Sequence, residues 1–242
     1  MALPIDSITP EHTLAARANF WSLLANVLIY DYLNRWNEAQ RDADGPAALL
    51  KQADDALQRA LALDPTIAMS HLADGFIRRA KGDHQGALNA FGRTLALDPK
   101  LALADVQKAN QFALLGRPQE ALVVLKAMEI SDDDQSIAVF KWVRGRVHFM
   151  LGEYGDAIDW LRESVEARPT LWFVWVHWVG ALALTDRKAE AAAKLKDFDN
   201  ALPGYNLARI QNIYLKELPN SDPTFFKTLL ELYRGLQEAG MK

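Results

Sequence analysis

The pattern of apolar and polar residues between Met69 and Pro99 predicts two helices joined by a tight turn. The first predicted helix runs from about residue 69 to 81, and the second from about residue 85 to 97. Gly82-Asp83 turns the chain between them. Asp98-Pro99 ends the second helix, because proline cannot continue a helix. We expect most of the remaining chain to consist of looser copies of this helical hairpin.

Small residues recur along the chain at spacings of 34 or 36 residues. In the predicted second helices they are Ala53, Ala87, Ala121, Ala157 and Ala191. A large apolar residue follows each of them after four positions: Leu57, Phe91, Leu125, Leu161 and Leu195. The turn glycines are Gly82, Gly116 and Gly152, and the closing prolines are Pro65, Pro99, Pro169 and Pro203. This self-similarity predicts a repeat architecture.

The spacing has a physical interpretation. Gly75, Ala109 and Gly145 in the first helices, together with the alanines of the second helices, allow the two backbones to approach closely. The large residue one turn later fills the space beside them. Since one helix pair cannot bury its apolar face alone, we expect neighbouring pairs to stack into a solenoid.

The spacing and the residue types resemble the tetratricopeptide (TPR) repeat, over about residues 47–203. One departure concerns positions 4, 7 and 11 of the first helix, which are large and apolar in that family. Here these positions hold mostly polar residues: His71, Asp74, Arg78, Asp105, Lys108, Phe112, Lys141, Arg144 and His148. The apolar face is therefore predicted to be rotated by about one residue relative to the family.

The predicted fold is all-α: a right-handed α-α superhelix of about five helix pairs, with extra helices at both ends and no strand. We expect a single domain over residues 1–242. It comprises an N-terminal helix and loop (1–46), the repeats (47–203) and C-terminal capping helices (204–242). Thr9-Pro10-Glu11 is a typical helix start, and we expect that helix to reach about Trp36. A polar loop follows to about Gly45.

A second resemblance covers residues 140–242. This part is similar to the TPR region that ends many bacterial adenylate/guanylate cyclases and related transcriptional regulators. It is carried by Gly145 and Gly152, by Ser221-Asp222-Pro223, and by the final segment from Leu229 to Gly240. The resemblance implies a regulatory or scaffold role in signalling, without cyclase chemistry.

Composition and charge narrow the classes of function. The chain has 242 residues, a net charge of −4 and no cysteine, which argues against a nucleic-acid binder, a disulfide framework and a thiolate metal site. Residues 1–9 lack the features of a signal peptide, and the apolar segments 23–33 and 171–184 are too short or too interrupted to span a membrane. We expect a bacterial, cytoplasmic protein.

No catalytic, nucleotide-binding or metal-binding motif is present. Asp42-Ala43-Asp44-Gly45 only faintly resembles a calcium loop, and a polar loop is the better interpretation. His148 is expected to be a core histidine with a backbone partner, and Trp175 and Trp178 are expected to be core residues. The prediction is a protein that is not an enzyme and has no cofactor.

The TPR resemblance implies that the first helix of each pair lines an inner, concave groove. The groove residues carried over from the family are Leu72, Phe76, Arg79, Val106, Asn110, Trp142, Arg146, Phe149, Phe173 and Val176. Most are apolar. Val106 stands where chaperone-binding TPR proteins have a lysine, so a chaperone-tail adaptor is not expected.

An open apolar groove would favour aggregation unless something covers it. A partner peptide or helix, a second copy of the chain, or the last helix of the same chain could do so. The first hypothesis is therefore a non-enzymatic scaffold that binds a protein or peptide in this groove. In it, Arg79, Asn110 and Arg146 would hold the polar ends or the backbone of the ligand. The second hypothesis is a regulatory, sensing or oligomerisation domain.

Overall fold

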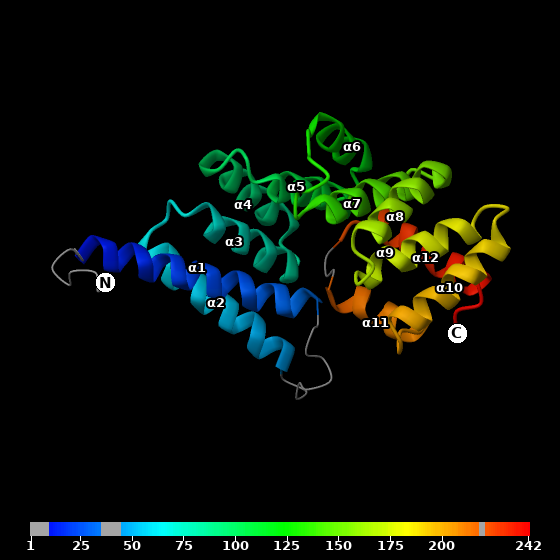
Figure 1. The fold of residues 1–242 in the computed structure, drawn as a ribbon. Helices are drawn as coiled ribbons and strands as arrows, with labels where there is room; N and C mark the ends of the chain where they lie inside the picture. The colour runs from blue at the N-terminus through cyan, green and yellow to red at the C-terminus, as the bar shows by residue number, and fades with distance from the viewer. Residues whose placement is uncertain (1–9, 35–44, 218–220) are drawn as a thin grey trace, which may run out of the picture. The chain divides into compact units, whose positions relative to one another are not determined.

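The computed structural model describes residues 10–34, 45–217 and 221–242. Within these ranges the chain forms twelve helices and no strand (Figure 1). The helices are α1 (Pro10–Asn34), α2 (Gly45–Leu63), α3 (Ala68–Ala80), α4 (His84–Leu97), α5 (Ala102–Leu114), α6 (Pro118–Ala127), α7 (Ile137–Met150), α8 (Tyr154–Ala167), α9 (Trp172–Ala183), α10 (Lys188–Ala201), α11 (Leu207–Glu217) and α12 (Pro223–Glu238). Residues 36–44 of the predicted loop lie outside the described residues, and so do residues 1–9. The three residues 42–44 that faintly resemble a calcium loop belong to this undescribed part.

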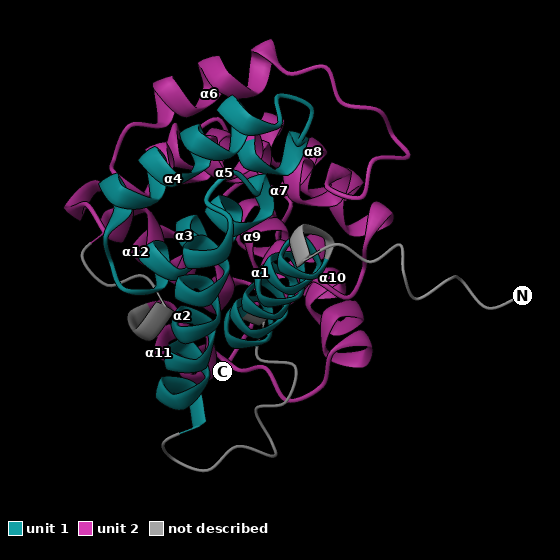
Figure 2. Cartoon of the chain, turned by 90° about the vertical axis from the view of Figure 1, so that its left-hand side faces the viewer, with its two compact units in different colours: residues 1–104 teal, residues 105–242 magenta. Residues whose placement is uncertain are grey.

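The chain divides into two compact units, residues 1–104 and residues 105–242 (Figure 2). The expectation of one domain over residues 1–242 stays a prediction.

The predicted turn glycines are confirmed. Gly82, Gly116 and Gly152 have φ values of 76°, 71° and 76°, in the left-handed region that side chains with a Cβ rarely adopt. Each lies just after the first helix of a pair, where a left-handed residue lets the chain reverse.

In unit 1, α1 packs against α2 and α3, and α3 packs against α4. The predicted small-against-large contact is present: a Cβ placed on Gly75 would lie 2.3 Å from the ring of Phe91. Ala53 of α2 and Ala87 of α4 are fully buried. The missing side chain of Gly75 is therefore what allows α3 and α4 to approach with the aromatic ring between them.

Unit 2 repeats the device. A Cβ on Gly145 of α7 would lie 2.7 Å from Leu161 of α8, and Ala157 and Leu161 are fully buried. Trp175 and Trp178 of α9 are buried, as predicted. Helix α9 is surrounded by α8, α10 and α12, which explains why its sequence is apolar on all sides.

The polar residues at the expected apolar positions have partners of their own. His71 Nε2 lies 2.8 Å from the carbonyl oxygen of Pro65, and the indole nitrogen of Trp175, at the same position of its repeat, donates to the carbonyl of Pro169 at 2.8 Å. Each side chain thus ties its helix to the proline that closes the preceding pair. The predicted rotation of the apolar face relative to the family stays a prediction.

Candidate interaction surface

The predicted groove residues lie mostly in the interior. Eight of them are buried: Leu72, Phe76, Val106, Asn110, Trp142, Arg146, Phe149 and Val176. Arg79 and Phe173 are partly exposed. Other helices of the same unit therefore cover these residues.

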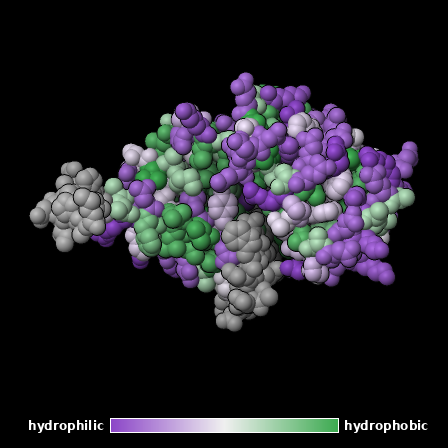
Figure 3. Space-filling model, in the orientation of Figure 1, coloured by the Kyte–Doolittle hydropathy of each residue, from purple (hydrophilic) through white to green (hydrophobic). Residues whose placement is uncertain are grey.

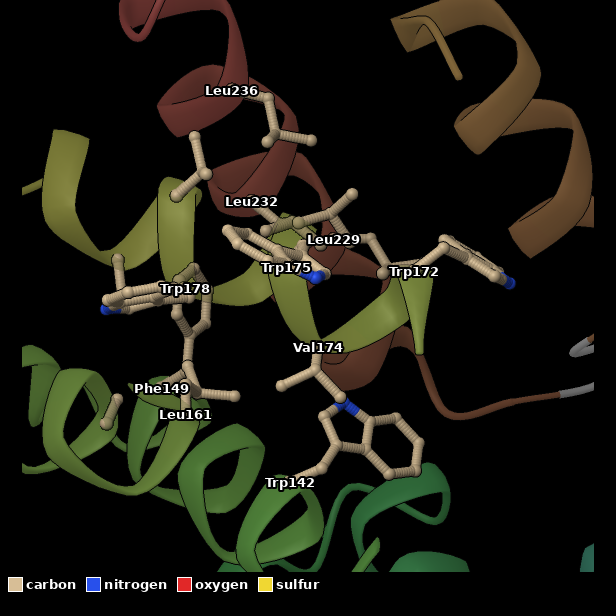
Figure 4. Packing of buried hydrophobic residues seen from close by; sticks show 14 of the residues in the cluster. Trp142, Phe149, Leu161, Trp172, Val174, Trp175, Trp178, Leu229, Leu232 and Leu236 are labelled. Atoms are coloured by element: carbon tan, nitrogen blue, oxygen red, sulfur yellow. The ribbon is translucent and has the colours of Figure 1, made fainter. Parts of the chain in front are cut away.

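In unit 2 the covering element is α12, which packs along α9 and touches α7. Gly180 of α9, one turn after the predicted groove residue Val176, meets Leu232 and Gly235. A Cβ on Gly180 would lie 2.6 Å from Leu232, and one on Gly235 would lie 2.5 Å from the carbonyl oxygen of Gly180. Figure 4 shows Leu229, Leu232 and Leu236 directed from α12 toward α9. Of the three occupants considered for the groove, the last helix of the same chain holds this position.

The start of α12 is attached to the end of α5. Pro223 stands in its first turn, and the side chain of Asp222 caps it by accepting from the amide of Thr224 at 2.7 Å. The amide of Asp222 donates to the carbonyl oxygen of Leu114 at 2.9 Å. Asp222 therefore both begins the helix and anchors it to the inner end of α5.

Helix α12 buries four large apolar side chains. Phe225, Leu229, Leu232 and Leu236 are all buried, and each contributes roughly 1.5–3 kcal/mol when fully removed from water. At the far end Glu238 pairs with Lys188 of α10 at 2.9 Å, a surface contact that adds little. A weakly binding peptide could not displace this helix from a folded chain.

A buried polar contact joins α5 and α7 beneath α12. The guanidinium of Arg146 donates to the side-chain oxygen of Asn110 and lies 3.5 Å from the backbone carbonyl of that residue. Its charged carbon lies 4.8 Å from the ring centre of Trp142 and 5.3 Å from that of Phe225. Arg146 is thus held between two aromatic rings, where cation–π attraction compensates part of its lost hydration.

His177 of α9 lies in an aromatic cluster close to Arg146. Trp142, Phe149 and Tyr214 all lie with ring centres 6.0–6.2 Å from it. Burial lowers the pKa of His177 to about 3, a hydrogen bond with the carbonyl oxygen of Phe173 opposes the shift, and the charge of Arg146 adds to it. The ring is therefore neutral near pH 7 and a poor proton acceptor.

His148, Glu153 and Asp156 form the one cluster of metal-ligating type among the described residues. His148 Nδ1 lies 2.7 Å from Glu153 and 4.0 Å from Asp156. The prediction that His148 has a backbone partner is wrong, because its Nδ1 contacts the carboxylate of Glu153. The equivalent positions of the earlier repeat hold Arg78 and Asp83, paired at 2.9 Å. In both repeats, a side chain in the last turn of the first helix therefore contacts the N-cap residue of the second helix. This contact of the repeat turn explains why His148 and Glu153 lie together.

In unit 1 the inner residue Phe76 of α3 is covered by α1. The ring of Tyr30 lies 5.0 Å from that of Phe76, and the guanidinium of Arg79 lies 5.2 Å from the same ring. Burial raises the pKa of Tyr30 to about 12, against the lowering effect of the Arg79 charge. The predicted inner face of this unit is thus part of the packing between α1 and α3.

The outer face of α1 is an apolar surface that was not among the predicted site residues. Eight large apolar side chains are exposed among the described residues, and four of them belong to this helix: Leu14, Phe20, Leu23 and Val27. Figure 3 shows hydrophobic surface gathered over the region of α1. The sequence signal was available, because residues 18–30 contain no charged residue.

The helices and their turns define the class of protein: an all-α protein with the fold of a TPR-type helical solenoid. No family model matches the chain. It is similar to the solved structure of PilW, a type IV pilus biogenesis factor, with a TM-score of 0.64 and 16% identity over 91% of this chain and 94% of that one. A structure of pilF from Pseudomonas aeruginosa gives a TM-score of 0.59 and 16% identity, over 88% of this chain and 92% of that one.

A tetratricopeptide repeat protein from Parabacteroides merdae is also similar, with a TM-score of 0.55 and 14% identity over 90% of this chain and 84% of that one. Identities this low establish the shared fold alone. Among the described helices, none combines the length and the apolar character needed to cross a membrane.

Proposed function

We propose that the chain is a non-enzymatic protein–protein interaction scaffold that binds an amphipathic helix or an apolar peptide on the inner face of unit 2. The observation that supports this proposal is the close packing of α12 on α9. Gly180, at an inner-face position, lets a helix backbone approach closely, and Leu232 packs directly against it. A surface that accepts one amphipathic helix in this way is chemically suited to accept another.

In this proposal the partner helix competes with α12. Its apolar residues would match the spacing of Phe225, Leu229, Leu232 and Leu236, with a small residue at the position of Gly235. The apparent affinity for such a partner depends on the fraction of molecules in which α12 no longer packs against α9. Arg146 and Asn110, which now bond to each other, would take the polar role in that open state.

The test measures binding of a fluorescent peptide of residues 221–242 to the full-length chain. Leu232 is buried, so Leu232→Asp in the chain should loosen α12. We expect this variant to bind the peptide at least about tenfold more tightly than the unmodified chain, because the open state is more populated. Fluorescence anisotropy gives both affinities.

Leu230→Asp is the matched control, because Leu230 lies on the same helix but is 67% exposed. The control should bind the peptide as weakly as the unmodified chain. Circular dichroism checks folding, and Leu232→Ala replaces the aspartate variant if that variant unfolds. Equal, weak binding by every variant would contradict the proposal.

A second candidate function, a regulatory or oligomerisation domain, is favoured by the exposed apolar residues of α1. The likeness to the TPR region of cyclase-type proteins stays a prediction. The residues that carry it have structural roles here: Asp222 caps α12, Gly235 permits the close crossing, and Gly240 has a φ of 101° after the helix end.

A further inference from the structure

The turn between α7 and α8 brings together three side chains of metal-ligating type. His148 Nδ1 lies 2.7 Å from Glu153 Oε2 and 4.0 Å from Asp156 Oδ2, and the three ligand atoms all lie within 4.8 Å of one another. Zinc holds nitrogen and oxygen ligands at about 2.0–2.2 Å, so two ligands of a tetrahedral site are about 3.4 Å apart. The two distances from Nδ1 lie on either side of this value, and rotation of the carboxylates adjusts both.

The backbone fixes the positions from which these side chains start. Gly152 turns the chain in the left-handed region, and the amide of Glu153 donates to the carbonyl oxygen of His148 at 3.0 Å. Asp156 lies in the first turn of α8. The side chain of His148 is 9% exposed, whereas those of Glu153 and Asp156 are 47% and 68% exposed. The turn therefore presents a fixed imidazole and two adjustable carboxylates that an ion can reach from solvent.

The charges of this turn differ from those of the corresponding turns of the other helix pairs. In those turns, an arginine pairs with a carboxylate at the start of the second helix: Arg78 with Asp83, Arg117 with Glu120, and Arg187 with Glu190. Glu153 and Asp156 have only His148 within ion-pair distance among the residues that the structure describes. The turn at Gly152 thus has two carboxylates and no permanent positive side chain beside them.

Two neighbouring carboxylates repel each other, and a nearby cation stabilises the charged form of both. The N-terminus of α8 supplies only a partial positive charge. A proton on His148 would add one charge, but it would occupy the nitrogen that faces the carboxylates. A divalent cation supplies two charges and accepts the lone pair of Nδ1, so it satisfies all three groups at once.

The donor atoms favour zinc among the common divalent cations. Magnesium and calcium take oxygen ligands, whereas an imidazole nitrogen together with carboxylates suits Zn²⁺. We propose that His148, Glu153 and Asp156 bind one Zn²⁺ ion, with water in the remaining coordination positions.

The surroundings of His148 set the expected strength of this site. Its Nε2 is buried and has no hydrogen-bond partner among the described residues. A hydrogen bond on the second nitrogen of a ligating histidine typically strengthens metal binding by about 10–100-fold. The site is therefore exchangeable and weaker than a closed structural zinc site.

The alternative is a hydrogen bond between His148 and Glu153 without an ion. The two interpretations differ at Asp156. Its carboxylate lies too far from Nδ1 to share the hydrogen bond, at 4.0 Å, but it is the third ligand of the proposed site. Removal of its charge should therefore weaken zinc binding and leave the contact between His148 and Glu153 intact.

Isothermal titration of the full-length chain with zinc chloride at pH 7, after treatment with a chelator, tests the proposal. We expect one Zn²⁺ per chain with a Kd of about 1–100 µM. Asp156→Asn should weaken binding at least about tenfold. Asp159→Asn is the matched control, because Asp159 lies on the same helix outside the cluster and its side chain is 70% exposed. The control should bind zinc like the unmodified chain.

Two further variants test the other ligands. Glu153→Gln and His148→Gln should each weaken zinc binding at least about tenfold, and circular dichroism checks that they fold. If His148→Gln unfolds, Asp156→Asn decides, because its side chain is exposed. Zinc should also raise the Tm of the unmodified chain and of Asp159→Asn, and it should raise that of Asp156→Asn much less.

A chain that binds no zinc would overturn the proposal. Zinc binding of equal strength in the unmodified chain and in Asp156→Asn would overturn it as well, because the ion would then be adventitious and held elsewhere. None of these results bears on the peptide binding proposed for unit 2, which is measured without zinc.

Discussion

At the residue scale, glycines at helix crossings decide how closely the helices pack. Gly75 and Gly145 could be identified from the repeat spacing, because their large partners lie in the next helix at a fixed separation. Gly180 and Gly235 could not, since their contact joins residues 55 positions apart. Nothing in the local sequence of either helix indicates the other.

A pair of glycine substitutions in unit 1 tests the role of close packing. Gly75→Ala should lower the free energy of unfolding by about 1–3 kcal/mol, because the new methyl group would overlap the ring of Phe91. Gly92→Ala in α4 is the control, where a Cβ has nothing within 4 Å. It should be neutral or stabilising by up to about 1 kcal/mol. Urea denaturation measures both, and equal effects would contradict the role of Gly75.

His177 predicts a dependence of stability on pH. Its pKa is about 3 in the folded chain and about 6.5 when unfolded, so protons bind preferentially to the unfolded state as the pH falls below about 6.5. Between pH 7 and pH 5 the free energy of unfolding should therefore decrease by about 1–2 kcal/mol from this residue. His177→Asn should show a shallower decrease over the same range. An unchanged slope would mean that His177 is not the group responsible.

At the element scale, α12 shows what a sequence pattern can and cannot establish. The sequence predicts capping helices over residues 204–242, and the structure has α12 there, with Asp222 as its cap. The sequence did not decide which of three occupants covers the groove. An amphipathic helix fits any apolar face of suitable width, so its pattern does not identify the face that it covers. Only the close crossing at Gly180 and the attachment to Leu114 locate it.

Asp222→Ala tests the attachment of α12. Loss of the cap should lower the free energy of unfolding by about 0.5–2 kcal/mol, and amide hydrogen exchange should become faster in α12 before it changes in α9. Thr228→Ala is the control, since its hydroxyl bonds only within α12, to Thr224 at 3.1 Å. Equal exchange in α12 for both variants would exclude a special role for Asp222.

At the scale of the whole molecule, repetition accounts for the fold. Each helix pair buries the alanine and the large residue of its own second helix and needs a neighbour for the rest. A helix pair at the end of the array has no further pair to cover its apolar face. The first and the last helix differ in how this face is covered. In unit 2 α12 covers the last inner face, whereas the outer face of α1 stays apolar and exposed.

By itself the sequence determined the repeat length, the helix pairs, the turns and the small-against-large contacts, because all of these depend on residues within about one repeat of each other. The tertiary structure alone decided that polar residues such as His71 and Arg146 are buried with partners, and that the inner face of unit 2 already holds a helix. Those outcomes depend on contacts between segments far apart in the chain. A one-dimensional pattern shows which surfaces must be covered, but it does not show which segment covers them.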